Sequence, residues 1–339
     1  MSFGAQLRLC LLLLATLCVV IAGVAVLART TPVFSQHVAR ELELLRQTNG
    51  LYYFDNAYVD EGDYVLLGQI EQDDFSRGGV YFIGSSELNM GLMDWALTPG
   101  ERRLIHNYSI GDLKHTEMRH YLRMLTEDTD LLQAGGDKTT IILGLSFQLA
   151  RRRQGEMYVE NLFERHRLYA YDWQGGIHRR DLPDYERAWI IERDRASRFL
   201  HKVFMPSSRI RTEADTPVEM REHMHRVMAG DWREAMQSEV AELAATIDDL
   251  QARGVRVWAL YPPSGSWQDE MPYEAAYRDM VGPILEARGV PLTDYGDLLP
   301  DAQYMDALHA RHDGQLSIHR AYHALALRAL ADMGTEVAP

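Results

Sequence analysis

The chain has 339 residues and a formal net charge of −14, and 46% of its residues are hydrophobic. This length and apolar content suffice for one large folded domain, or for a domain with an insertion. The excess of acidic residues argues against a protein that binds nucleic acid through the phosphates. It also disfavours a strongly anionic polymer as substrate unless the binding cleft is locally basic.

The N-terminal part of the chain contains an apolar segment, residues 9–28, in which Thr16 is the one strongly polar side chain. An apolar helix of about 20 residues is long enough to span the hydrocarbon core of a bilayer. We therefore expect a single-pass transmembrane anchor at 9–28, with residues 1–8 in the cytoplasm. The alternative is a cleaved signal peptide, for which Val26-Leu27-Ala28 provides a cleavage site.

Both interpretations export the remainder of the chain. The two cysteines, Cys10 and Cys18, lie inside the apolar segment, so the exported part contains none. An exported domain without disulfides fits a bacterial cell envelope. We therefore expect this domain to face the periplasm from the inner membrane.

After the anchor we expect a juxtamembrane and approach segment at 29–78, with a helix over 30–50, and a folded domain at 79–339. Within that domain, short apolar runs alternate with helical patterns. We expect helices at 114–132 and 315–333, and strands at 80–83, 103–108, 139–145, 255–261 and 290–293. This alternation predicts an α/β fold of three layers, α/β/α, with a parallel sheet. Ligands of such folds bind at the carboxyl ends of the strands.

The region from about 150 to 250 interrupts this alternation. It is rich in Arg, Glu, Met and His, and prolines at 183, 206 and 217 punctuate it. We interpret it as a helical insertion without strands. Its function is left open between a lid or docking surface and a peripheral helical layer.

The turn after the first expected strand of the sheet carries Gly84-Ser85-Ser86-Glu87. Hydrolases of the α/β class place a nucleophilic serine on such a strand-to-helix turn, close to backbone N–H groups. Near the end of the chain, Asp306-Ala307-Leu308-His309 places a carboxylate and an imidazole three residues apart. A serine hydroxyl needs a base to take its proton, and a carboxylate orients that base. We predict Ser86 as nucleophile, His309 as base and Asp306 as the orienting carboxylate.

A tetrahedral intermediate also needs hydrogen-bond donors for its oxyanion. The backbone N–H of Ser86 is the first candidate. Gly111 follows the second expected strand and Gln148 follows the third. Because these positions lie at the carboxyl ends of neighbouring strands, we expect all three donors to lie at one site. No metal or cofactor is expected.

The order of these motifs resembles the SGNH hydrolase superfamily. More closely, the chain resembles DltD, the membrane-anchored family of the teichoic acid D-alanylation system. That family has Gly-Ser-Ser-Glu at the nucleophile, as at residues 84–87, and Ser-Pro-Gln after the third strand, similar to Ser146-Phe147-Gln148. It also has a proline-led loop with a tryptophan, similar to residues 262–267, and Asp-x-x-His followed by a glycine, matched here by Gly314.

The resemblance implies substrate-binding roles for Glu87, Ser146 and Trp267. The chain departs from the family pattern at Phe147, which replaces a proline, and it lacks the aromatic residue expected between His309 and Gly314. His312 stands in that interval, so an exchange of roles between the two histidines stays open.

These observations predict an extracytoplasmic serine-dependent O-acyltransferase or esterase that acts on a cell-envelope polysaccharide through an acyl-serine intermediate. The acyl group is of the acetyl or D-alanyl type. The resemblance implies a multi-spanning membrane-bound O-acyltransferase as partner, and an exopolysaccharide or lipopolysaccharide as the acceptor glycan. Two alternatives remain: a secreted carbohydrate esterase that removes acetyl groups, and a non-catalytic scaffold subunit of an acylation or polymer-synthesis complex.

Overall fold

A computed structural model of the chain describes residues 3–30, 40, 43–52, 61–93, 96–152, 158–172, 176–204 and 210–335. The expected juxtamembrane helix lies partly outside these ranges, but residues 43–48 are helical. Of the expected approach segment, residues 61–70 form helix α3 (Glu61–Ile70) and residues 53–60 lie outside the described ranges.

The centre of the fold is a sheet of five parallel strands in the order β3-β2-β4-β8-β9. The bounds of these strands are β2 Gly79–Ile83, β3 Ile105–Asn107, β4 Thr139–Gly144, β8 Arg256–Tyr261 and β9 Leu292–Asp294. Every residue of β2 and β4 is buried, as expected for central strands covered on both faces. Edge strand β9 has no buried residue.

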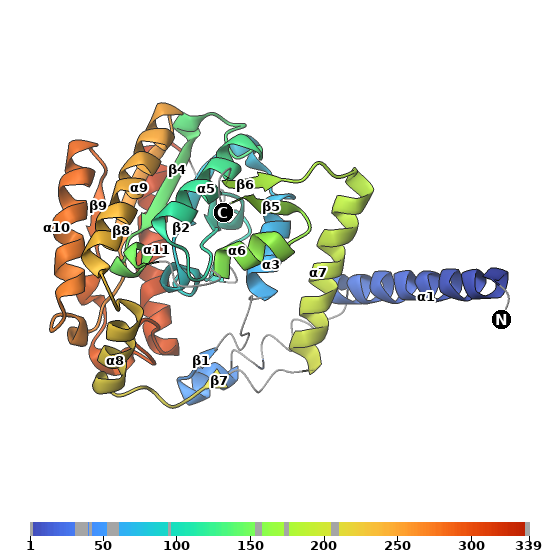
Figure 1. Cartoon of the computed structure of the whole chain (residues 1–339), viewed down its shortest axis with the longest axis horizontal. Coiled ribbons are helices and arrows are strands. Elements are labelled where there is room, and N and C mark those ends of the chain that lie inside the picture. Colours follow the sequence, from blue (N-terminus) through green and yellow to red (C-terminus); the bar gives the residue numbers. More distant parts are fainter. Residues whose placement is uncertain are drawn as a thin grey trace.

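Helices cover both faces of this sheet (Figure 1). Helices α5, α9 and α10 pack together in one layer, where the ring of His115 at the start of α5 lies parallel to the ring of Tyr277 on α10. Helix α11 covers the other face, and its Tyr322 stacks on Phe82 of β2 at 5.9 Å between ring centroids. The bounds of these helices are α5 His115–Glu127, α9 Trp232–Ala252, α10 Pro272–Ala287 and α11 His312–Asp332. The predicted three-layer α/β/α fold is therefore confirmed.

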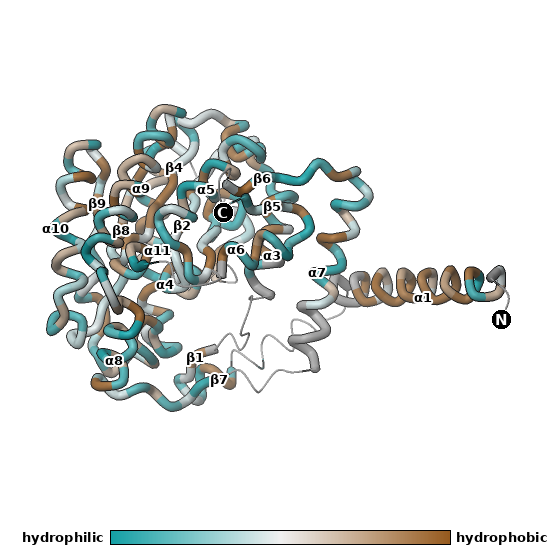
Figure 2. Tube along the Cα trace, in the orientation of Figure 1, coloured by the Kyte–Doolittle hydropathy of each residue, from teal (hydrophilic) through white to brown (hydrophobic). Residues whose placement is uncertain are grey.

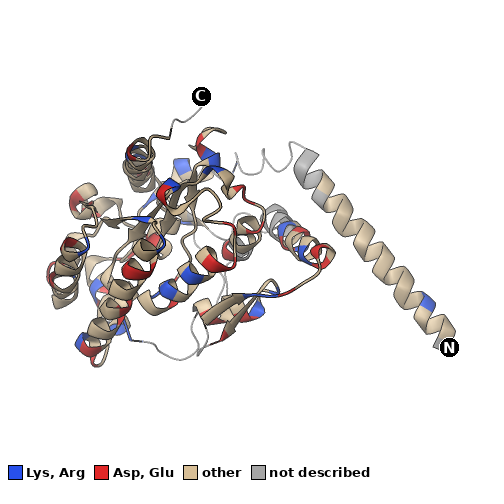
Figure 3. Cartoon of the chain, turned by 90° about the horizontal axis from the view of Figure 1, so that it is seen from above, with Lys and Arg blue, Asp and Glu red and all other residues tan. Residues whose placement is uncertain are grey.

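The N-terminal helix α1, Phe3–Thr30, projects away from this body (Figure 1). Figure 2 shows it apolar along most of its length, and Figure 3 shows it almost free of charged residues, whereas both signs of charge are spread over the rest of the molecule. Its segment Gly4–Val24 is long and apolar enough to cross a membrane. A membrane anchor and a signal sequence share these properties.

The region between β4 and β8 differs from the prediction of a purely helical insertion. Besides α6 (Tyr158–Arg165), α7 (Asp184–Phe204) and α8 (Pro217–Val227), it contains an antiparallel hairpin of β5 (Tyr169–Asp172) and β6 (Gly176–Arg179). It also contains β7 (Ile210–Arg211), which pairs with β1 (Leu51–Tyr52). Its last helix, α9, is part of the layer that covers the sheet. These strands have two to four residues, too few for a recognisable period-two pattern.

Candidate active site

Ser86 is the first residue of the short helix α4, Ser86–Asn89, which follows β2 directly. Two glycines allow this helix to lie against the sheet. A Cβ at Gly144 would lie 2.2 Å from Leu88 Cδ1, and a Cβ at Gly84 would lie 3.0 Å from Leu88 Cδ2. Because Leu88 occupies the space that two side chains would fill, α4 begins at the carboxyl edge of the central strands and holds Ser86 there.

Ser86, His309 and Asp306 form one hydrogen-bonded chain. His309 Nε2 lies 2.9 Å from Ser86 Oγ, and His309 Nδ1 lies 3.0 Å from both carboxylate oxygens of Asp306. In the neutral tautomer that this network favours, Nδ1–H donates to the carboxylate and Nε2 accepts from the serine hydroxyl. His309, and not His312, occupies this position, because His309 Nε2 is the imidazole nitrogen that contacts Ser86 Oγ. His312 Nδ1 is buried and has no hydrogen-bond partner among the described residues.

The loop that carries Asp306 and His309 is held by backbone hydrogen bonds. Asp306 Oδ1 accepts from the backbone N–H groups of Leu308 and His309, both at 2.9 Å, and Met305 N–H donates to His309 O at 2.8 Å. Burial acts to raise the pKa of Asp306, but His309 and these N–H groups outweigh it and lower the pKa to about 2. Burial acts to lower the pKa of His309, and Asp306 more than compensates, so the pKa is raised. The carboxylate is thus charged wherever the imidazole titrates.

Glu87 follows Ser86 in the sequence, and its side chain lines two small cavities. Its carboxylate accepts a hydrogen bond from Ser146, and its charge and that of His309 act on one another. Burial raises the pKa of Glu87 to about 7, against the lowering effects of His309 and Ser146. The ionisation of Glu87 and that of the His309 imidazole are therefore coupled.

The two cavities are small. The first has a volume of about 20 Å³ and lies between Glu87, Ser146 and the loop that follows β8. The second, of about 10 Å³, lies between Glu87, His309 and Tyr304. A void of this size holds about one water-sized group.

The three predicted oxyanion donors differ in their surroundings. As the first residue of a helix, Ser86 has a backbone N–H without an intrahelical partner. Gly111 N–H faces Asp63 Oδ2 at 3.4 Å. Gln148 is 6% exposed, and its Nε2 has no hydrogen-bond partner in the described part of the chain. Ser86 N–H and the Gln148 amide are therefore the donors that remain available for a ligand.

Trp267, predicted to bind substrate, lies in the core below the site. It is 2% exposed, and its ring meets that of Tyr304 edge-on at 4.8 Å between centroids. Tyr304 in turn begins the loop that leads to Asp306. The indole thus packs against Tyr304, at the start of the loop that carries Asp306 and His309, and it is almost fully buried.

Sequence reasoning missed the polar residues that fix the nucleophile turn. Asn107 Nδ2 donates to the carbonyl oxygens of Leu88 and Asn89, at 3.0 and 3.1 Å, and so caps the C-terminal end of α4. The side-chain amide of Asn89 donates to Asp63 Oδ1 at 3.2 Å, and Asp63 is 2% exposed. The available signal was Asn107 itself, an amide near the carboxyl end of the strand expected at 103–108.

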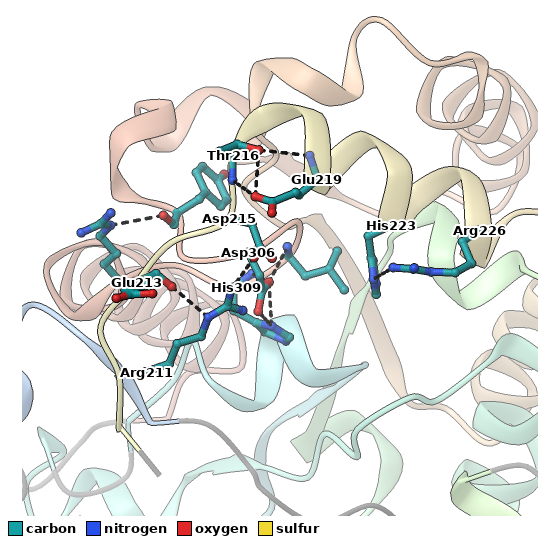
Figure 4. A network of polar contacts seen from close by, with 12 residues as sticks. Arg211, Glu213, Asp215, Thr216, Glu219, His223, Arg226, Asp306 and His309 are labelled. Atoms are coloured by element: carbon teal, nitrogen blue, oxygen red, sulfur yellow. Dashed lines mark hydrogen bonds and ion pairs between the residues drawn. The ribbon is translucent and has the colours of Figure 1, made fainter. Parts of the chain in front are cut away.

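The insertion also reaches the site, which sequence reasoning left open. Figure 4 shows Arg211, Asp215 and His223, from β7 to α8, around Asp306 and His309. Asp215 N–H donates to Met305 O at 2.8 Å. Burial lowers the pKa of His223, and the charge of Asp306 acts in the opposite direction. The insertion therefore forms one side of the environment of the loop that carries Asp306 and His309.

No protein-family model matches the chain, and no curated protein is similar to it. Solved structures with a similar arrangement include a GDSL-like lipase from Bacteroides thetaiotaomicron, with 11% identity and a TM-score of 0.38 over 80% of this chain and 98% of that one. Another is a catalytic mutant of Axe2, an acetylxylan esterase from Geobacillus stearothermophilus, with 12% identity and a TM-score of 0.38 over 78% of this chain and 99% of that one. At this level of similarity, the substrate must be argued from the site itself.

Proposed function

We propose that the protein is a serine-dependent enzyme of acyl transfer, in which Ser86 is the nucleophile. The observation that carries the proposal is the hydrogen-bonded chain from Ser86 Oγ through His309 to Asp306. This arrangement is the one required for a serine to attack a carbonyl carbon at neutral pH. The same groups recur on unrelated folds, so their geometry and not the fold supports the activity.

In the proposed reaction, Ser86 Oγ attacks the carbonyl carbon of an ester while His309 Nε2 takes the hydroxyl proton. The tetrahedral oxyanion is held by Ser86 N–H and the Gln148 amide. His309 then gives the proton to the departing alcohol oxygen, which leaves an acyl-serine. A second hydroxyl, from water or from an acceptor sugar, gives its proton to His309 as its oxygen attacks the acyl carbon. The bond between the acyl carbon and Ser86 Oγ then breaks, His309 returns the proton to Ser86 Oγ, and the acid or the new ester leaves.

The acyl group in this proposal is short. An acetyl group or another small acyl group is favoured because the two cavities that Glu87 lines among the described residues have volumes of only about 20 and 10 Å³.

We further propose that the physiological acceptor is a cell-envelope polysaccharide. The apolar helix α1 supports an anchored enzyme, and an anchored enzyme acts on substrates close to the membrane. The acyl donor is then delivered by a multi-spanning O-acyltransferase, with the catalytic domain in the periplasm. A secreted deacetylase shares the chemistry but needs neither an anchor nor a donor partner.

The test of the chemistry is labelling of the full-length protein with a fluorophosphonate, together with hydrolysis of p-nitrophenyl acetate. Wild type should be labelled and should hydrolyse the ester, and Ser86→Ala should do neither. Ser85→Ala is the matched control, because Ser85 is adjacent and its side chain makes no capping hydrogen bond. Absence of labelling in wild type, or equal labelling of Ser86→Ala, would overturn the assignment and favour a scaffold.

The acceptor is tested by mass analysis of envelope polysaccharides from a strain that lacks the gene and from one that carries Ser86→Ala. Loss of a short acyl ester in both strains would support a transferase. An increase of that ester in both strains would instead identify a deacetylase. A change in the deletion strain alone would mean that the protein acts without its serine.

A further inference from the structure

The segment that leads from the N-terminal helix into the body ends against the catalytic loop. Residues 43–48 are helical, and Asn49 ends this helix in the left-handed region, with φ of 47°. Gly50 N–H donates to Leu45 O at 3.3 Å, and Leu45 and Leu51 are 7% and 0% exposed. Asn49 and Gly50 are therefore held in the body of the protein on both sides.

Asn49 and Gly50 supply the N-terminal cap of α11, the helix that begins three residues after His309. Gly50 O accepts from His312 N–H at 3.1 Å, and Asn49 Oδ1 accepts from Asp313 N–H at 3.0 Å. These are the first N–H groups of α11, which need partners outside their own helix. The helix's own N-cap residue, Arg311, makes no side-chain cap hydrogen bond.

The same two residues are fixed from the opposite side by the insertion. Leu51 and Tyr52 pair with Arg211 and Ile210. A Cβ at Gly50 would lie 2.7 Å from Ile210 Cγ2 and 2.8 Å from Arg211 O, so the segment fits there only without a side chain.

The catalytic loop is thus held at both ends. Asp215 N–H bonds to Met305 O before Asp306, and the 49–50 cap bonds to α11 after His309. Within the loop, the Nε2 atom of His309 must stay within hydrogen-bond distance of Ser86 Oγ, which comes from a different element. Displacements of about 1 Å at such a site cost about 100-fold in rate.

We propose that Asn49, with Gly50, is a positioning residue for His309, so that the segment joining the N-terminal helix to the body sets the competence of the triad. This inference rests on the proposed acyl chemistry. Asn49 contacts no substrate. It acts through the first turn of α11, by fixing the end of the loop that aims His309 at Ser86.

The test uses the full-length protein and a series at position 49. Asn49→Gly tolerates the positive φ and removes the side-chain oxygen that accepts from Asp313 N–H. Asn49→Ser has a shorter side chain with an oxygen acceptor, and Asn49→Asp keeps an acceptor oxygen at the same position. We expect kcat for p-nitrophenyl acetate and the rate of fluorophosphonate labelling to fall about tenfold in Asn49→Gly. They should fall less in Asn49→Ser and stay near wild type in Asn49→Asp, with KM unchanged throughout.

A pH profile separates positioning from stability. Because Asp306 raises the pKa of His309, a loosened His309–Asp306 pair lowers it, so the acid limb of kcat/KM should move to lower pH in Asn49→Gly. The control is Asp74→Ala, which removes a remote capping acceptor of Ser76 N–H and should lower Tm without changing kcat or the acid limb.

The inference is overturned if Asn49→Gly lowers Tm as Asp74→Ala does while kcat and the acid limb keep their wild-type values. If Asn49→Gly does not fold, Asn49→Ser provides the same comparison. Failure of the proposed function is separate, because it is read from Ser86→Ala, whose labelling does not depend on position 49.

Discussion

Glu87 and His309 line the same small cavity, and the charge of each shifts the pKa of the other. An ionised Glu87 raises the pKa of His309, and a protonated His309 lowers the pKa of Glu87 from the value that burial alone would give. Two groups coupled in this way titrate together, so a pH profile reports the pair. The neighbour of the nucleophile therefore helps to set the pH range in which the histidine can act as a base.

The first prediction concerns Glu87→Gln. His309 must be neutral to accept the proton of Ser86, so activity falls as pH decreases through its raised pKa. Without the carboxylate the pKa of His309 is lower, and the acid limb of kcat/KM should move to lower pH. The profile is measured with a soluble ester from pH 4 to 9. An unchanged limb would show that the two groups are not coupled, and a shift to higher pH would contradict the direction of the coupling.

The second prediction concerns Asp306→Asn. The amide no longer stabilises the imidazolium and favours the wrong tautomer of His309, so kcat should fall by about 10³- to 10⁴-fold. Fluorophosphonate labelling should slow in parallel. The matched control is Asp301→Asn, an exposed carboxylate nearby that accepts from Ser266 and should leave kcat within about twofold. If both variants lose activity equally, the loop and not the carboxylate is the sensitive feature.

The sheet was predictable because its central strands are buried on both faces and are read from the sequence as unbroken apolar runs. Both β2 and β4 were placed within one residue of their observed ends. The edges of the fold were less predictable. The strand expected at 103–108 is helical at its start, over Glu101–Arg103, and pairs only from Ile105 to Asn107. An edge strand is harder to predict from the sequence because it pairs with a neighbouring strand on one side only.

Ser86, Asp306 and His309 could be named as candidates because each belongs to a short local motif, Gly-Ser-Ser-Glu or Asp-x-x-His, and the structure places them in one hydrogen-bonded chain. The residues that support them could not be named in this way. Asn107 caps α4 from the neighbouring strand. Asn49 caps α11 by accepting a hydrogen bond from Asp313 N–H, 264 residues later in the chain. Such partners are set by tertiary contacts between distant segments, for which a single sequence carries no periodic signal.

The third prediction concerns the space under the nucleophile turn. In Gly144→Ala the new Cβ would lie 2.2 Å from Leu88 Cδ1. Because the Leu88 side chain is buried, it cannot move out into solvent to relieve this contact. Overpacking of this kind costs about 1–3 kcal/mol, and moving Leu88 displaces α4 and Ser86 with it. We expect a lower Tm and slower fluorophosphonate labelling.

The control for Gly144→Ala is Gly282→Ala on α10, where a Cβ meets no atom within 4 Å. There the substitution should be neutral or slightly stabilising, because alanine favours a helix by about 1 kcal/mol over glycine. Wild-type labelling in Gly144→Ala would show that the turn tolerates a wider separation of α4 from the sheet.

The last prediction uses the unpaired amide of Gln148 to separate stability from activity. A buried polar group without a partner costs about 1–3 kcal/mol, and Gln148 Nε2 is in that position among the described residues. Gln148→Met has a similar shape without the amide, so the protein should become more stable and Tm should rise. If the amide binds the oxyanion, kcat should fall by about 10²-fold in the same variant, because an oxyanion donor acts on the transition state, and KM should change little. A higher Tm with unchanged kcat would remove Gln148 from the oxyanion site.

A lower Tm of Gln148→Met would mean that the amide has a partner in solution, such as an ordered water. Only the combination of a more stable protein and a slower enzyme fits a donor that is kept unpaired for its ligand.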